Sequence, residues 1–569
     1  MPVLLCGLFL FELGVGVISL FQIGAVYGII VRYNYANCTY MNTFTKILKA
    51  LGYILFFGVM AWLAVILFFE AEYNGVVNQW FGENGDQVQT HNVEKLVIAE
   101  PLPMQGVEPT LFDSFTRQRL NNVYETLIKP DRDLNMKPAL ALSWGMVGET
   151  VWEFRLRPSV IFHDGTDLDA EDVYESIIRS RDMKTSQLRD LLSTIKDVEI
   201  IDELTLMVET HDPDPLLLQK LATVYILPSL TLKQYEDDLI ETPVGTNSYE
   251  VRALSQNGVL SLERFDRYWG DLPDFREVEY VTISNTEGRV QAVRDGSVDI
   301  LDYVPHDFVS EIEELSAGYN LYSVPSLEVQ FIMFNGNRKL LQDPDLRRAM
   351  VRTIDREGYA EYLGEFARPS YQFVSNGVFG FNPDIFEFNY DLDSATNLLK
   401  DLGLDEEPVK VCLPKGLENL GEYLTIQFAE IGLDPVVEYL DGPDYLKALQ
   451  RGRFDIYFMG FRSELGDASD FFTSVIHSQE TVGDEQYGQY NFAKYADEEL
   501  DAMIEAQEQE LDAQSRLDML QSIMKRIVEI DVVGVPLFEY ETVFAAKSGL
   551  QFEPRIDGFI YLNELTYED

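Results

Sequence analysis

Residues 152–173 (WEFRLRPSVIFHDGTDLDAEDV) constrain the fold more than any other stretch of the chain. Residues 152–157 alternate large apolar with polar side chains, the period of a half-buried strand. A second short apolar run at 160–162 is followed by a turn, in which Gly165 accepts a positive φ. Asp169 then precedes acidic residues, as an N-cap precedes the first turn of a helix. This order of strand, turn, strand, turn and helix predicts an α/β chain and by itself indicates no chemistry.

One local pattern occurs in both halves of the chain. Residues 292–300 (AVRDGSVDI) and 448–456 (ALQRGRFDI) share the end of a helix, a glycine, one spacer and the start of a strand. Gly296 and Gly452 suit the left-handed residue that follows a helix. Such a pair indicates one lobe in each half of the chain, although helix–glycine–strand joints are also common in α/β proteins generally.

The second half also predicts alternating helices and strands. Asp343-Pro344 marks the start of a helix, with proline at its first position. An apolar helical pattern at 420–431 ends before Gly432, and residues 435–440 have the composition of a strand.

Residues 152–173 resemble the signature region of family 5 extracellular solute-binding proteins, the peptide-, dipeptide- and nickel-binding receptors of ABC importers. Further segments resemble that family in the same order, from about residue 94 to the C-terminus. They are 122–127 (NVYETL), 138–144 (PALALSW), 244–249 (VGTNSY), 267–270 (RYWG) and 353–356 (TIDR). Asn247 and Ser248 stand where the family has Gly and Pro.

The resemblance implies a two-lobed, periplasmic-binding-protein-like α/β fold of type II, with an extra subdomain and a discontinuous first lobe. The implied ranges are 94–126, 241–326 and 535–569 for lobe I, 127–240 for the extra subdomain and 327–534 for lobe II.

The resemblance also implies a ligand site at residues 460–472 (GFRSELGDASDFF), which are similar to a segment of the family's cleft. In peptide-binding members the first acid of that segment holds the α-ammonium group of the ligand. That acid corresponds to Glu464, and Asp467 corresponds to the second acid. A sheltered carboxylate binds an ammonium group through a charge-assisted hydrogen bond worth roughly 1.5–3 kcal/mol. Either acid could instead be an ordinary solvated side chain.

Two departures bear on how a ligand would sit in this segment. Glu464 is one methylene longer than the usual Asp, and Ala468 replaces the usual Pro. Phe461 is expected either to form the wall of a ligand pocket or simply to pack in the core.

The N-terminus has the composition of a membrane anchor. Residues 51–69 form an uncharged apolar run long enough to span a bilayer, and residues 2–31 form a second apolar run. Residues 32–50 between them carry bases and no acid, which places this loop in the cytoplasm and the large domain outside. Met41 is an alternative start that leaves a single anchor. We therefore expect an uncleaved anchor of one or two helices at 1–69 and a stalk at 70–93.

The chain has a formal charge of −51, from 95 acidic and 44 basic residues. We expect no nucleic-acid partner, because phosphate binding needs a basic surface. The acidity suits either a solvated surface, for instance in a salty medium, or attraction of cationic ligands.

No motif in the sequence supports catalysis or a bound cofactor. The chain has no HExxH, GxSxG or Walker lysine motif, and its histidines lack metal-ligand spacing. We therefore expect neither enzymatic activity, nor a cofactor, nor a metal site.

The expected function is a membrane-anchored, monomeric receptor that captures short peptides outside the cytoplasm. It would deliver them to the permease and ATPase subunits of an ABC importer. Two alternatives stay open. The ligand could be another solute, such as an oligosaccharide or chelated nickel, or the chain could be a tethered surface sensor or adhesin without a transporter.

Overall fold

The computed structural model describes residues 95–567, except 236–237, 256–257, 315–317, 386–387, 403–407 and 483–484. The expected anchor at 1–69 and stalk at 70–93 lie outside the described residues. Among the residues that are described, no helix has the length and apolar character needed to cross a bilayer.

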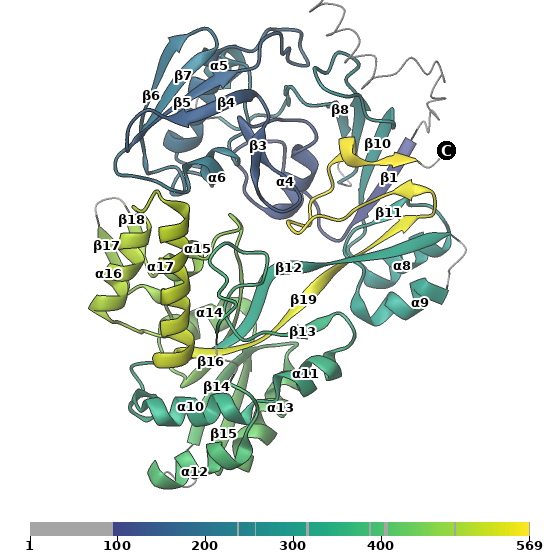
Figure 1. The fold of residues 1–569 in the computed structure, drawn as a ribbon. Coiled ribbons are helices and arrows are strands. Elements are labelled where there is room, and N and C mark those ends of the chain that lie inside the picture. Colours follow the sequence, from purple (N-terminus) through teal and green to yellow (C-terminus); the bar gives the residue numbers. More distant parts are fainter. Residues whose placement is uncertain are drawn as a thin grey trace, which may run out of the picture. The chain divides into compact units, whose positions relative to one another are not determined.

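A mixed sheet forms the framework of the described chain and runs through both lobes (Figure 1). Its strand order is β15-β14-β16-β12-β19-β11-β1-β10-β9-β8, and β13 pairs with β19. β12 (Tyr319–Phe334) and β19 (Gly534–Lys547) are long, antiparallel and shared by the two halves. We call the half with β1 and β8–β11 lobe I, and the half with β13–β16 lobe II.

Lobe I is built around a short parallel core. β1 (Lys95–Glu100) lies parallel to both β10 (Glu277–Thr282) and β11 (Ile300–Leu301). β8 (Tyr249–Leu254) and β9 (Leu260–Arg264) extend the sheet antiparallel. Helices α8 (Thr286–Arg294) and α9 (Val309–Glu314) bury apolar side chains against one face of this sheet. Helix α4 (Ser114–Leu120) contributes Leu120 to the core on the other face.

Lobe II has helices on both faces of its part of the sheet. Its strands are β13 (Ala367–Pro369), β14 (Pro408–Pro414), β15 (Asp434–Leu440) and β16 (Ile456–Arg462). Helices α10 (Pro344–Thr353), α12 (Leu392–Leu402) and α13 (Glu418–Glu430) cover one face. Helices α16 (Glu498–Gln507) and α17 (Ala513–Lys525) cover the other. The helix predicted at Asp343-Pro344 is confirmed, and the Asp343 side chain caps it.

The extra subdomain is a four-stranded antiparallel sheet packed on helix α5. Its strand order is β4 (Ala141–Met146), β5 (Val151–Leu156), β7 (Thr205–Thr210) and β6 (Ile195–Asp202). The predicted order of strand, turn and helix within 152–173 is confirmed. α5 (Ala170–Asp182) begins at a capping box, in which Asp169 accepts from the backbone N–H groups of Glu171 and Asp172. The short apolar run at 160–162 forms only a single β-bridge, between Ile161 and Asp167.

The repeated helix–glycine–strand pattern is confirmed at both positions. Gly296 has φ +64° after α8, and Gly452 has φ +59° after α14 (Gly442–Gln450). The chain enters β11 a few residues after the first glycine and β16 a few residues after the second. Each lobe therefore receives one strand of its parallel core from the same local motif.

Candidate functional site

The parallel strands of each lobe end where the two lobes approach each other. In lobe I, β11 is followed by Asp302 and Tyr303, and in lobe II β16 ends at Arg462. The Tyr303 hydroxyl lies within electrostatic range of Arg462 and of Glu328 on β12. Ligands of open α/β sheets bind outside the carboxyl ends of the strands, so this region is the candidate site.

Glu464 lies just beyond the end of β16 and is the more accessible of the two predicted acids. Its side chain keeps 33% of its surface exposed, and its Oε1 lies 3.4 Å from Nε of Arg462. The turn continues to Gly466, whose φ of +67° lets the chain reverse. The structure thus presents a partly exposed carboxylate beside a single positive charge, that of Arg462.

Asp467 is buried and already has a protein partner. Its two carboxylate oxygens accept from the guanidinium of Arg516 on α17 at 2.7 and 2.8 Å, and Oδ1 also accepts from the backbone N–H of Ser469. Only 1% of the residue is exposed. In this geometry Asp467 anchors the turn to α17, and a direct contact with ligand stays a prediction.

A third acid of the same segment, Asp470, had been given no role by sequence reasoning. Burial raises the pKa of Asp470 to about 7, and the charges of Glu464 and Asp467 act in the same direction. The sequence feature that could have pointed to Asp470 is its position, a few residues after the two acids of the motif. Like charges close together disfavour simultaneous ionisation. An ionised Asp470 therefore raises the free energy of an ionised Glu464, and a protonated Asp470 removes that repulsion.

Phe461 lies on β16 and is half-buried in the lobe II core. Its ring meets Phe471 edge to face, with centroids 5.3 Å apart. This packing supports the core interpretation of Phe461, and a ligand contact stays a prediction.

Tyr303, Glu328 and Arg462 were also missed as site residues. Tyr303 is 54% exposed and has φ +63°, which is unusual for a bulky residue at the end of a strand. Sequence cannot show this conformation. Glu328 and Arg462 are partners in the register of β12 and β16, so only strand pairing brings them together.

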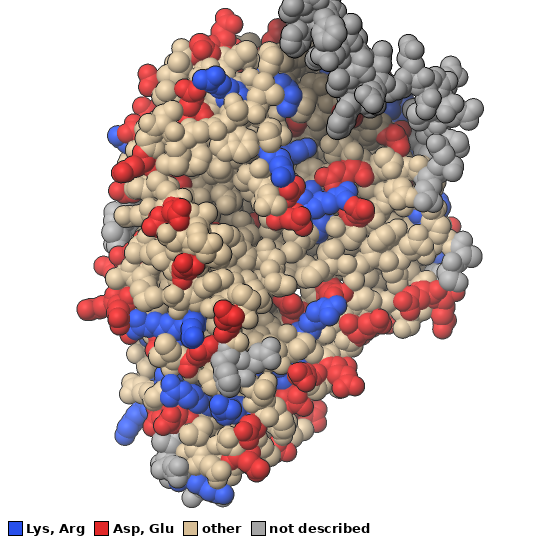
Figure 2. Space-filling view, in the orientation of Figure 1, with Lys and Arg blue, Asp and Glu red and all other residues tan. Residues whose placement is uncertain are grey.

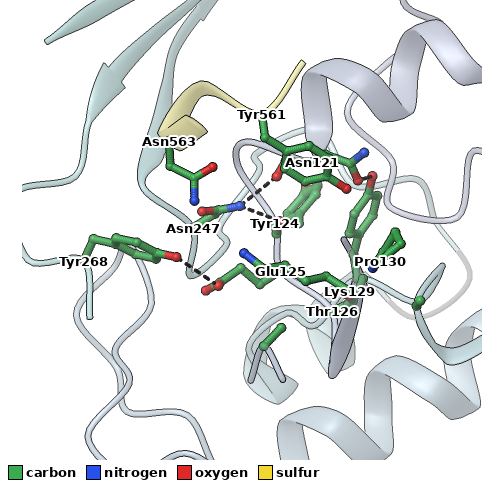
Figure 3. Close-up of a pocket in the computed structure, with 13 residues that line it drawn as sticks. Asn121, Tyr124, Glu125, Thr126, Lys129, Pro130, Asn247, Tyr268, Tyr561 and Asn563 are labelled. Atoms are coloured by element: carbon green, nitrogen blue, oxygen red, sulfur yellow. Dashed lines mark hydrogen bonds between the residues drawn. The ribbon is translucent and has the colours of Figure 1, made fainter. Parts of the chain in front are cut away.

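A small polar pocket lies near the base of the extra subdomain (Figure 3). Its volume of about 30 Å³ is suited to water rather than to a peptide. Glu125 lies in its wall and accepts from Trp269 Nε1 at 2.9 Å and from Thr246 Oγ1 at 2.8 Å. Burial raises the pKa of Glu125 to about 7. This network joins three of the segments that carry the family resemblance, and it is a structural joint.

Within the described ranges, no group of three or more His, Cys, Asp or Glu side chains is arranged to hold a metal ion.

Comparison with known sequences gives a consistent assignment. Residues 135–482 match the profile of the bacterial extracellular solute-binding proteins, family 5 (middle region). The dipeptide-binding protein of Escherichia coli strain K12 is 22% identical over 435 residues, covering 69% of this chain and 80% of that protein. The glutathione-binding protein GsiB of Salmonella paratyphi A is 21% identical, covering 69% of this chain and 79% of its own.

Solved structures show the same fold. HbpA2 from Haemophilus parasuis has a TM-score of 0.76 at 19% identity and covers 84% of this chain and 100% of its own. The oligopeptide-binding protein AppA from Bacillus subtilis, in complex with a nonapeptide, has a TM-score of 0.67 at 18% identity and covers 84% and 99%. The two-lobed α/β fold is therefore confirmed. The chain belongs to the family 5 bacterial extracellular solute-binding proteins.

Proposed function

We propose that this protein is a membrane-anchored, extracytoplasmic receptor that captures short peptides between its two lobes for an ABC importer. The observation that carries the proposal is the accessible carboxylate of Glu464 beyond the end of β16, at the position that corresponds to the ammonium-binding acid of the family. The relatives named above as dipeptide- and oligopeptide-binding proteins support a peptide as ligand.

The peptide would lie extended between the lobes, with its ammonium group at Glu464 and its side chains in permissive pockets. Contacts with both lobes would favour the closed form, because a ligand shifts the equilibrium only through its greater affinity for one state. The permease and ATPase subunits would supply the energy of transport. The receptor itself would act as a monomer.

The test is to purify the full chain in detergent from peptide-rich medium and record native mass spectra before and after denaturation. Released masses that sequence as short peptides support the proposal, whereas a protein that carries none and also ignores added peptides contradicts it.

The Glu464→Gln variant should weaken peptide retention by roughly 10-fold or more, because it removes a charge-assisted hydrogen bond worth at least about 1.5 kcal/mol. Glu422→Gln, an exposed acid on α13, is the matched control and should retain peptide like the parent. Equal retention by both variants would show that Glu464 does not hold the ligand.

A further inference from the structure

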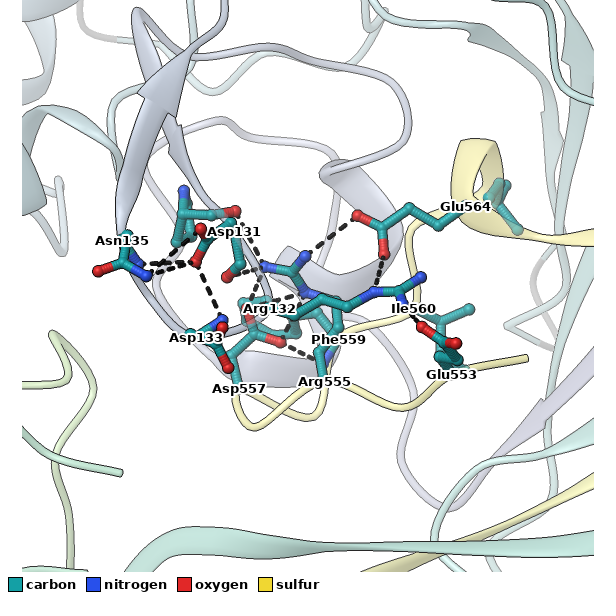
Figure 4. Close-up of polar contacts among 12 residues, drawn as sticks. Asp131, Arg132, Asp133, Asn135, Glu553, Arg555, Asp557, Phe559, Ile560 and Glu564 are labelled. Atoms are coloured by element: carbon teal, nitrogen blue, oxygen red, sulfur yellow. Dashed lines mark hydrogen bonds and ion pairs between the residues drawn. The ribbon is translucent and has the colours of Figure 1, made fainter. Parts of the chain in front are cut away.

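Hydrogen bonds and ion pairs join a hairpin of the extra subdomain to the C-terminal segment 553–564 (Figure 4). The hairpin consists of β2 (Ile128–Pro130) and β3 (Met136–Pro138). Arg555 is only 3% exposed and donates to the backbone carbonyls of Pro130 and Asp131 at 3.0 and 2.9 Å. A buried guanidinium that bonds the hairpin from the C-terminal segment makes the two segments one unit.

Both arginines of this unit are paired with acids of the C-terminal segment. Arg555 pairs with Asp557 at 2.9 Å and with Glu564 at 3.1 Å. From the hairpin, Arg132 reaches Glu564 at 3.2 Å and also pairs with Glu553. If the hairpin moved independently of the C-terminal segment, it would break the partly exposed ion pairs of Arg132 and the hydrogen bonds from buried Arg555 to the carbonyls of Pro130 and Asp131.

The tip of the hairpin is ordered so that Leu134 projects from it. The carboxylate of Asp131 accepts from the backbone N–H groups of Asp133 and Asn135 at 3.0 and 2.9 Å. Leu134 takes φ +65°, a conformation that the turn imposes on an apolar residue.

Both segments insert an apolar side chain against lobe II, and each meets a glycine there. Leu134 lies on Gly466, where an added Cβ would come within 2.6 Å of Leu134 Cδ1. Ile556 lies on Gly377, where an added Cβ would come within 1.9 Å of Ile556 Cδ1. Leu134 and Ile556 are both partly buried against the lobe II core. Because glycine has no side chain, each of these two positions leaves the space that a side chain from the other lobe occupies.

These contacts lie on both sides of Glu464. Gly466 follows it by two residues, and Arg462 precedes it by two and donates from Nη2 to the backbone carbonyl of Asp557 at 2.7 Å. The turn that carries Glu464 is therefore held against lobe I before and after the acid.

We propose that the hairpin and the C-terminal segment form a clasp that closes over the Glu464 turn, and that Leu134, Ile556 and Arg462 are positioning residues of the ligand site. They act on the ligand through Glu464. They set the lifetime of the closed complex by holding Glu464 against lobe I. The inference rests on the proposed function only for the identity of what is held at Glu464.

The decisive experiment is a reversible cross-link across the clasp. Gly377→Cys and Ile556→Cys are combined in the full chain after Cys6, Cys38 and Cys412 are replaced by Ala. Gly377 does not have a positive φ, and replacing Ile556 removes the side chain that a Cβ at 377 would strike. We expect a disulfide to form under mild oxidation without added ligand, because bridged Cβ atoms lie about 3.5–4.5 Å apart.

The probe is a synthetic library of tripeptides with free termini. The oxidised protein should exchange these peptides at least roughly 100-fold more slowly than the reduced protein, because a locked closed state blocks entry and release. Dithiothreitol should restore exchange. Failure of the disulfide to form, or peptide exchange at the same rate before and after reduction, would overturn the proposal.

The single variant Leu134→Ala separates positioning from general stability. We expect its peptide dissociation rate to rise by roughly 10-fold with little change in association rate, since changes within one interface act mostly on dissociation. Leu230→Ala, which removes a side chain that is 73% exposed on α7 (Ser229–Tyr235), should change neither rate. An unchanged dissociation rate in Leu134→Ala contradicts the clasp.

Failure of the clasp and failure of the peptide hypothesis give different results. If no tripeptide binds even the reduced protein, the proposed function fails. The clasp is then still decided by the yield of the disulfide and by small-angle scattering, in which Leu134→Asp should enlarge the radius of gyration relative to Leu230→Asp. Equal radii would overturn the clasp.

Discussion

At the residue scale, neighbouring acids of the Glu464 turn have different roles because they have different partners. Asp467 uses both carboxylate oxygens on Arg516, whereas Glu464 keeps a third of its side chain exposed beside Arg462. Asp470 forms no ion pair with a basic side chain of the described residues, and burial raises its pKa to about 7. Three carboxyl groups of one segment therefore behave differently: one forms a buried ion pair, one is an accessible charge, and one binds a proton near neutral pH.

The contrast between Asp467 and Asp470 gives a prediction for stability. Asp467→Asn should destabilise the protein by about 3–5 kcal/mol, because it leaves the buried guanidinium of Arg516 unpaired. Asp470→Asn should cost little at pH 8.5, since its folded pKa of about 7 lies above the usual 3.8 and the buried ionised form opposes folding there. Urea unfolding of both variants measures the difference, and equal losses would contradict this assignment.

Glu125 gives a prediction for pH dependence. Its folded pKa of about 7 exceeds the ordinary value of 4.5, so its contribution to stability is complete below about pH 4.5 and is lost as the pH rises through 7. At about 1.4 kcal/mol per pKa unit, the loss is up to about 3 kcal/mol. Glu125→Gln should flatten the dependence of unfolding free energy on pH between 5 and 8. Fluorescence of Trp269, which donates to Glu125, should lose its titration near pH 7 in this variant.

At the element scale, short local signals fix where helices and strands begin and end. Asp169 and Asp343 cap the helices that the sequence predicted after them. Gly296 and Gly452 end helices and start strands in the left-handed conformation. These signals are local because each depends only on the backbone within a few residues.

The joint at Gly452 can be tested directly. Gly452→Ala should lower the free energy of unfolding by about 1–2 kcal/mol, because an L side chain is strained at a positive φ. No neighbouring atom lies closer than 3.7 Å to an added Cβ, so the loss would come from the backbone alone. Gly452→Asn should recover part of it, since Asn tolerates this conformation. Thermal unfolding of the pair provides the measurement, and equal melting temperatures of Ala and Asn variants would contradict the explanation.

At the scale of the whole molecule, the chain combines a shared sheet with a strongly acidic surface. The long strands β12 and β19 pair with each other and connect the two lobes. Figure 2 shows acidic side chains spread over the visible face with basic side chains between them, rather than gathered at one place. On this face the distribution favours a solvated acidic surface over a single attractor for cations. The domain boundaries inferred from the resemblance, such as 327–534 for lobe II, stay a prediction.

The formal charge of −51 predicts a dependence on salt. Raising NaCl from about 0.05 to 1 M should increase the free energy of unfolding by a few kcal/mol, because salt screens repulsion among surface acids. An equal osmolality of sucrose, which does not screen charge, serves as the control. A melting temperature that responds equally to sucrose and to NaCl would show that screening is not the cause.

The sequence by itself determined the α/β class, several of the helices and strands, and the resemblance to the family. Strand periodicity, helix caps and turn glycines are local, and the motifs at 122–127, 152–173 and 267–270 each lie within one short segment. It also singled out the segment with Glu464, because the motif is contiguous.

Only the tertiary structure decided what each side chain of the site contacts. Arg516 meets Asp467 through the packing of α17, and Arg462 meets Glu328 through strand register. Leu134 and Ile556 meet lobe II from segments far apart in the chain. Partners distant in sequence are set by the burial and charge balance of the whole fold, and no local pattern encodes them.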